Sequence, residues 1–95
     1  MKVKILKSAI NDIKEIHGYL NEFGPEPAEK LKLSFKKFCS QVIDTPFLWP
    51  VCANTPDYRR AVLEYGYLLF YKVDEKAKLV KIYRVLHGKR NVSLR

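Results

Sequence analysis

The chain has 95 residues, of which 47% are hydrophobic and 29% charged, and its formal net charge is +8 at pH 7. This length and composition are typical of one soluble domain spanning residues 1–95, and they exclude a disordered chain. No segment approaches the roughly 18 consecutive apolar residues of a transmembrane helix, and we find no secretory signal, so we expect a cytoplasmic protein that does not bind a membrane.

The positive charge is concentrated in the last third of the chain. Residues 1–44 contain eight Lys or Arg against six Asp or Glu, whereas residues 58–95 contain ten against three, and Asp57 completes the balance of +8. Such asymmetry indicates an anionic partner, either nucleic acid or an acidic protein. An ordinary solvated basic surface remains the alternative.

The two cysteines, Cys39 and Cys52, have neither CxxC spacing nor a nearby histidine. We therefore expect no metal site and no other cofactor. Reduced thiols in the cytosol are the favoured interpretation, and a disulfide between the two cysteines is the alternative.

The N-terminal half predicts a strand followed by two helices. Basic and apolar residues alternate over residues 2–7, which is typical of a half-buried strand. Ser8 offers an N-cap hydroxyl, and Asp12 lies near the positive end of the helix that it would begin. The apolar stripe of this helix follows steps of three and four: Ile10, Ile13, Ile16, Leu20 and Phe23.

Gly24 predicts the end of the first helix, and the prolines at positions 25 and 27 suit the first turn of a second. The second helix has the clearest periodicity in the chain, with apolar residues at steps of three and four: Ala28, Leu31, Phe35, Phe38 and Val42. It ends at residues 44–46. Two such helices form an αα-hairpin that needs a sheet to cover its apolar stripe.

Residues 46–57 hold three of the five prolines and no regular period. We expect Phe47, Leu48 and Trp49 to plug one end of the core, with a partner-binding role as the alternative.

The C-terminal third predicts an antiparallel meander of three strands, Tyr58–Glu64, Tyr67–Val73 and Leu79–His87. The connections, Tyr65-Gly66 and residues 74–78, are too short for crossover helices. The predicted fold class is therefore α+β, in the order β-α-α-β-β-β. An αα-hairpin packs on a small, mainly antiparallel four-stranded sheet.

Cleavage of RNA without a metal ion requires a base for the 2′-hydroxyl, an acid for the leaving oxygen, and cations on the phosphate. Glu64 and His87 are the candidates for base and acid. The candidate cations lie in the same third of the chain: Arg59, Arg60, Arg84, Lys89 and Arg90. Because Arg and His near strand ends more often make surface or turn contacts, these residues alone do not identify an enzyme.

Three local patterns in the meander resemble the RelE/ParE superfamily of bacterial type II toxin–antitoxin toxins: Tyr58-Arg59-Arg60-Ala61, Leu69-Phe70-Tyr71-Lys72-Val73 and Ile82-Tyr83-Arg84-Val85-Leu86-His87. The resemblance covers essentially the whole chain, although the helices match only in pattern. It implies the βααβββ toxin fold.

The RelE branch of this superfamily implies ribosome-dependent cleavage of mRNA. Here Leu68 follows Gly66-Tyr67 where that branch has a phosphate-binding Arg, Ala61 stands in place of a Lys, and residues 91–95 contain no Tyr. If the chain is such an endoribonuclease, the resemblance assigns its catalysis to the remaining cations and histidine: Arg59, Arg84, His87 and Arg90.

The Tyr-Arg-Arg opening and the Arg-Val-Leu-His close are instead similar to the ParE branch, which we favour. This branch implies the toxin of a plasmid-stabilisation module that inhibits DNA gyrase by binding, with no catalytic residues. His87 then orients the end of the sheet, and Arg84 joins a basic surface or a buried ion pair. The resemblance makes residues 88–95 the effector element. The residues expected to contact the target or the antitoxin are Arg59, Arg60, Arg84, His87, Lys89 and Arg90.

The resemblance also implies a small antitoxin that wraps the toxin and represses its own operon with it, so that operator DNA is contacted only through the antitoxin. A sheet with exposed Tyr and Arg suits an acidic helix or an added strand that folds on binding. We expect half of the tyrosines at positions 65, 67, 71 and 83 merely to line the sheet. A third alternative is a degenerate toxin that acts only as an antitoxin-binding corepressor.

Overall fold

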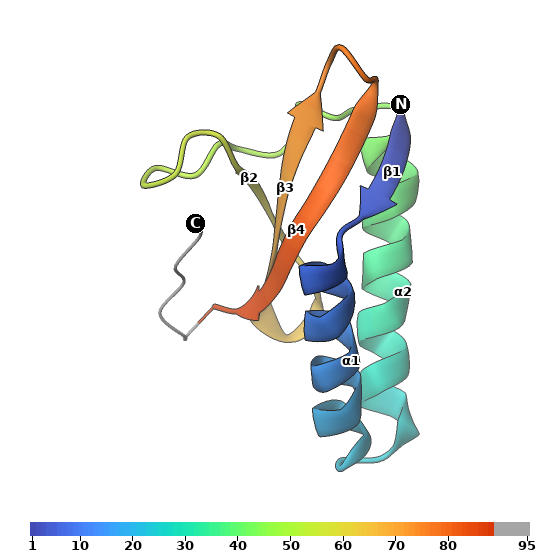
Figure 1. Cartoon of the computed structure of the whole chain (residues 1–95). Coiled ribbons are helices and arrows are strands. Elements are labelled where there is room, and N and C mark those ends of the chain that lie inside the picture. Colours follow the sequence, from blue (N-terminus) through green and yellow to red (C-terminus); the bar gives the residue numbers. More distant parts are fainter. Residues whose placement is uncertain (89–95) are drawn as a thin grey trace.

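Two helices pack against a four-stranded sheet in the computed structural model, which describes residues 1–88 (Figure 1). In chain order the elements are β1 (Lys2–Ile5), α1 (Lys7–Asn21), α2 (Pro25–Val42), β2 (Arg59–Val62), the short 3-10 helix η1 (Glu64–Gly66), β3 (Tyr67–Asp74) and β4 (Leu79–His87). The predicted α+β class and β-α-α-β-β-β order are confirmed.

The strands lie in the order β1-β4-β3-β2. β2 pairs with β3, and β3 with β4, in antiparallel fashion, which confirms the predicted meander. β1 pairs with β4 in parallel, from Lys2 opposite Leu79 to Ile5 opposite Ile82. This parallel pair is possible because the rest of the domain lies between the two strands along the chain.

β4 is nine residues long and β1 only four, so β4 continues beyond the strand that covers its edge. The predicted N-cap role of Ser8 is wrong, because its hydroxyl bonds to this uncovered part of β4. α1 begins at Lys7 with no side-chain cap, and the Ser8 hydroxyl donates to the carbonyl of Tyr83 over 2.6 Å. The hydroxyl thus satisfies an edge acceptor of β4 that β1 is too short to reach.

The apolar stripe predicted for α1 is shifted by one position at its start. Ala9 is fully buried whereas Ile10 is 39% exposed, and Phe23, beyond the end of the helix, is 64% exposed. Ile13, Ile16 and Leu20 do belong to the core. We attribute the shift to the small side chain of Ala9, which lets the start of α1 approach the sheet closely.

The stripe predicted for α2 is confirmed. Ala28, Leu31, Phe38 and Val42 are buried, and Phe35 packs against them. They meet the buried residues of the three meander strands: Ala61, Leu69, Tyr71, Val80, Ile82 and Val85. The buried residues of α2 recur every three or four positions and those of the strands mostly at every second position. Each element therefore presents one apolar face to the other.

The expectation that residues 47–49 plug the core is right only for Trp49. Its ring packs edge-on against Phe38 and Tyr71, at centroid distances of 4.8 and 6.2 Å. For Phe47 and Leu48 the expectation is wrong, because these residues are 49% and 69% exposed. The backbone carbonyls of this loop accept hydrogen bonds from the side chains of Arg59 and Tyr71.

β2 is shorter than predicted because the turn begins at Glu64. Tyr65 and Gly66 both have positive φ, at 62° and 75°, and the N–H of Leu63 donates to the carbonyl of Tyr67 over 2.7 Å. The predicted turn at Tyr65-Gly66 is therefore present, with Gly66 at a position that favours glycine.

Cys39 and Cys52 are free thiols, each half-buried, and burial raises the pKa of the Cys39 thiol. Within residues 1–88 no helix has the length and apolar character needed to cross a membrane.

Candidate functional site

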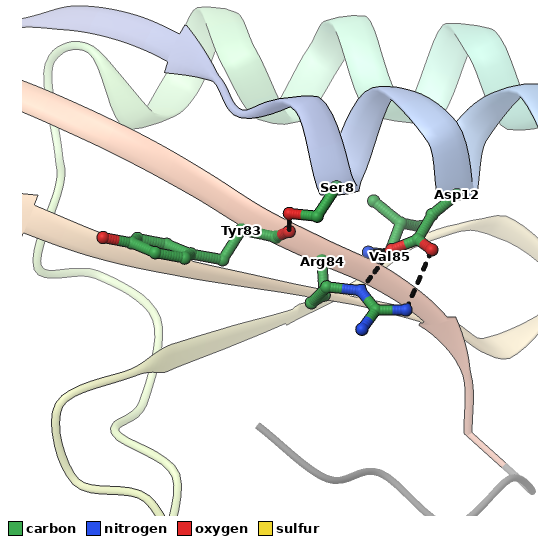
Figure 2. A network of polar contacts seen from close by, with 5 residues as sticks. All are labelled: Ser8, Asp12, Tyr83, Arg84 and Val85. Carbon is green, nitrogen blue, oxygen red and sulfur yellow. Dashed lines mark hydrogen bonds and ion pairs between the residues drawn. The ribbon is translucent and has the colours of Figure 1, made fainter. Parts of the chain in front are cut away.

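Arg84, a predicted cation of the site, is held in an ion pair with Asp12 of α1. The guanidinium donates to both carboxylate oxygens, with Nε 2.7 Å from Oδ2 and Nη2 3.0 Å from Oδ1 (Figure 2). The same Oδ2 accepts the backbone N–H of Val85 over 3.0 Å. The hydrogen bond between the Arg84 guanidinium and Asp12 raises the pKa of Arg84 above its usual value. Of the two expectations for Arg84, the ion pair is the one present.

Asp12 thus has a different role from the one expected. It does not lie in the first turn of α1, where it would interact with the helix dipole. Its carboxylate instead accepts the N–H of Val85 at the edge of β4, and it neutralises the guanidinium of Arg84. No local sequence signal predicts this pairing, because the partner lies on a strand at the other end of the chain.

Arg59 is also engaged inside the protein. One guanidinium nitrogen donates to the carbonyls of Phe47 and Trp49, at 3.3 and 2.7 Å, and the guanidinium lies 5.1 Å from the centroid of the Phe47 ring. Nearby, the buried hydroxyl of Tyr71 donates to the carbonyl of Pro46 over 2.8 Å. Burial raises the pKa of Tyr71 to about 12. Arg59 and Tyr71 together fix the loop before β2.

Glu64 and His87, the predicted acid–base pair, are not brought together. Glu64 lies in the groove between α2 and β2, which has a volume of about 660 Å³ and which we call the β2–α2 groove. His87 lies in a second groove, of about 580 Å³, between α1 and the end of β4. There its ring packs edge-on against Tyr67, at a centroid distance of 5.1 Å.

Among the other predicted cations, Arg60 is exposed on β2, opposite Phe70, which in turn lies opposite Arg84. The expectations for Lys89, Arg90 and the rest of the tail fall outside the described residues. Of the four tyrosines, Tyr67 and Tyr71 are buried, Tyr83 is half-buried and Tyr65 is 43% exposed. That half of them line the core agrees with the prediction.

A cation–aromatic cluster on the face of the sheet away from the core was not predicted from the sequence. Lys72 follows Tyr71 and precedes Val73, both packed in the core, so its side chain points to the opposite face. Its ammonium lies 4.5 Å from the ring centroid of Tyr58 and 5.0 Å from that of Tyr83. Alternation along the strands could have placed these residues on one face, but not in contact.

No group of three or more His, Cys, Asp or Glu side chains within residues 1–88 is arranged to hold a metal ion. What these residues do present is two grooves, an exposed Arg60, and two arginines, Arg59 and Arg84, that are hydrogen-bonded within the protein.

The model of one protein family, the ParE toxin of the type II toxin–antitoxin system parDE, matches residues 3–92. The chain belongs to the ParE toxin family. This agrees with the branch favoured from the Tyr-Arg-Arg and Arg-Val-Leu-His patterns. No match of significance was found among curated proteins.

Two solved structures share the fold of this ParE-family chain. The chromosomal ParDE toxin–antitoxin system of P. aeruginosa superposes with a TM-score of 0.75 at 20% identity, covering 92% of this chain and 95% of that one. The intact E. coli RelBE toxin–antitoxin complex gives 0.67 at 20% identity, covering 94% and 98%. The similarity extends to both branches, so the βααβββ toxin fold is confirmed.

Proposed function

We propose that this type II toxin inhibits DNA gyrase by binding it, that it does not cleave RNA, and that a cognate antitoxin neutralises it. The observation that carries this proposal is the engagement of Arg84 and Arg59. Both are needed as phosphate-binding cations in the ribonuclease alternative, and both are already hydrogen-bonded within the protein. A charge neutralised by an adjacent carboxylate contributes little to stabilising a transition-state phosphate.

The separation of Glu64 and His87 supports the same proposal. General acid–base cleavage needs both groups within hydrogen-bond reach of one substrate, and these two line different grooves. Inhibition by binding needs no such pair. It needs an exposed surface, and Arg60 is the exposed basic residue of β2. We retain Arg60, His87, Lys89 and Arg90 as proposed contacts, and assign Arg59 and Arg84 to positioning.

An antitoxin partner is supported by the family and by both structural relatives, which are toxin–antitoxin systems. The formal charge of +8 favours an acidic partner. Operator DNA would then be contacted through the antitoxin, in a complex that represses its own operon. Such a module would stabilise a plasmid that carries it.

The test is supercoiling of relaxed plasmid by purified gyrase with ATP, titrated with this protein, beside a reaction with translating ribosomes and a reporter mRNA. We expect supercoiling to be lost and cleaved DNA to accumulate while the mRNA stays intact. Codon-periodic cuts in the mRNA with normal supercoiling would overturn the proposal in favour of the interferase. Activity in neither reaction would favour a degenerate toxin that acts only as a corepressor.

A further inference from the structure

The loop between α2 and β2, residues 43–58, exposes apolar side chains although its backbone is fixed by hydrogen bonds. Phe47, Leu48 and Val51 are 49%, 69% and 45% exposed. The loop as a whole extends past the edge strand β2 (Figure 1). Single exposed apolar residues are ordinary on a protein surface, whereas several within one short segment indicate a place where another protein binds. We call these three side chains the apolar loop surface.

The rest of the domain holds the backbone of this loop in place. The guanidinium of Arg59 donates to the carbonyls of Phe47 and Trp49, and it lies over the Phe47 ring. Val51 forms an isolated antiparallel bridge with Arg59, and the ring of Trp49 packs edge-on against that of Phe38. Apolar side chains on a preordered loop lose little conformational entropy when a partner covers them, so they are suited to be anchors of an interface.

The charge of the loop differs from that of the rest of the chain. None of the eighteen Lys and Arg residues lies between Lys37 and Arg59, and this stretch contains two acids, Asp44 and Asp57. Both acids are exposed, and neither makes an ion pair with another residue of the described range 1–88. The partner surface that complements the loop is therefore an apolar hollow with basic residues at its rim.

This chemistry separates the loop from the acidic antitoxin expected for the basic surface. A strongly acidic protein, like DNA itself, would be repelled by the two aspartates and would gain nothing from the apolar loop surface. Gyrase, the proposed target, is a protein that binds DNA. An enzyme of this kind carries basic residues along the path of the DNA, and these can meet carboxylates of a bound inhibitor.

We propose that the apolar loop surface is a contact between this toxin and gyrase. Phe47 and Leu48 enter an apolar hollow of the enzyme, while Asp44 and Asp57 meet basic residues at the rim of that hollow. This inference rests on the proposed function, which names gyrase as the target, and it adds a surface outside the basic contacts proposed there.

A matched pair of leucine substitutions tests the apolar contact. The affinity of purified gyrase for the immobilised toxin is measured by surface plasmon resonance. Leu48→Ser should weaken binding about tenfold, because it removes a large apolar side chain from the interface. Leu33→Ser, on α2 at a side chain 58% exposed, should bind within about twofold of the parent. Equal affinity of Leu48→Ser and the parent overturns the proposal.

A matched pair of double variants tests the charge. Asp44→Asn with Asp57→Asn should weaken gyrase binding about threefold at low salt. Glu22→Gln with Glu29→Gln, at two exposed positions on the helical side, raises the net charge by the same amount and should not weaken binding. Equal weakening by the two double variants would indicate a general effect of net charge and overturn the role given to the aspartates.

Photo-crosslinking identifies the occupant directly. Leu48 is replaced by p-benzoylphenylalanine, and the toxin is irradiated with purified gyrase. We expect a crosslink to gyrase from position 48 and none from the same replacement of Leu33. A crosslink from position 48 to a second copy of the toxin, but not to gyrase, overturns the proposal in favour of a toxin dimer.

Failure of this inference is distinguishable from failure of the proposed function. If the parent protein does not bind gyrase, both are overturned. If the parent binds gyrase and inhibits supercoiling while Leu48→Ser does both equally well, the proposed function stands and the role of the loop is overturned. Circular dichroism of each variant checks the fold, which substitutions of exposed side chains should leave intact.

Discussion

Arg84 and Asp12 form a bidentate ion pair although 72 residues separate them in the sequence. The pair joins α1 to β4 just beyond the point where β1 ends, and the carboxylate also accepts the N–H of Val85. With the Ser8 hydroxyl bound to the Tyr83 carbonyl, α1 supplies polar partners for an edge that no strand covers. One helix thus provides the polar partners of this edge and pairs the Arg84 cation with a carboxylate.

Asp12→Ala should destabilise the fold by about 1 to 2 kcal/mol, because it removes a charge-assisted hydrogen bond and leaves the Val85 N–H without a partner. Partial exposure of Arg84, whose side chain is 37% exposed, keeps the effect below that of a fully buried pair. Urea unfolding measures the change. The control is Glu15→Ala, an exposed acid one turn along α1, which should change the free energy of unfolding by less than about 0.5 kcal/mol. Equal effects of the two substitutions would contradict the role given to Asp12.

Tyr71 should make the stability depend on pH in the alkaline range. Burial raises its pKa to about 12 in the folded protein, against about 10 in an unfolded chain. The folded state therefore holds the proton more tightly. The stability that this contributes is fully present below about pH 10 and is lost as the pH rises towards about 12.

Tyr71→Phe tests this dependence. The substitution removes the hydrogen bond to Pro46, and should cost about 1 kcal/mol at neutral pH. The difference in the free energy of unfolding between parent and variant should shrink above pH 10. Tyr19→Phe, at a side chain 55% exposed, is the matched control for the loss of a phenol hydroxyl at the surface. A constant difference for Tyr71→Phe would be inconsistent with a raised pKa.

Arg59→Lys should loosen the loop before β2 without unfolding the domain. A lysine cannot reproduce the contact of the guanidinium with the Phe47 ring together with the hydrogen bonds to two carbonyls. Amide exchange should quicken about tenfold at Leu48 and Cys52, whose N–H groups are bonded within and beside this loop. Arg60→Lys, at the exposed neighbouring position, should leave both amides unchanged. Unchanged exchange in Arg59→Lys would show that Trp49 and Tyr71 fix the loop alone.

Two glycine substitutions should change stability in opposite directions. Gly18 lies inside α1, and no atom lies within 4 Å of the position that an added methyl group would take, so Gly18→Ala should stabilise by about 0.5 to 1 kcal/mol. Gly66 has a φ of 75°, and Gly66→Ala should destabilise by about 1 kcal/mol. Thermal unfolding of both variants measures the pair. Stabilisation by Gly66→Ala would mean that the turn at Tyr65-Gly66 has a different backbone conformation.

Much of the fold could be predicted from local patterns. The stripe of α2 was predicted residue by residue, and the strand Leu79–His87 has the predicted bounds. These features depend on which residues recur on one face of an element, and that information lies along the chain. The start of α1 was harder, because strand β1 runs almost directly into the helix and no side chain caps it.

The site could be predicted only as a set of residue types. The sequence identified Arg59, Arg84, Glu64 and His87 as candidates. Its three meander patterns pointed to the RelE/ParE superfamily, and two of them pointed to the ParE branch that the family model supports. By itself it determined the secondary structure, the meander and the excess of positive charge, since these follow from composition and periodicity. Only the tertiary structure decided that Asp12 neutralises Arg84, that Arg59 binds loop carbonyls, and that Glu64 and His87 line different grooves. The physical reason is that a charged or hydrogen-bonding group takes its role from the partner brought beside it. Here folding selects that partner from distant parts of the chain.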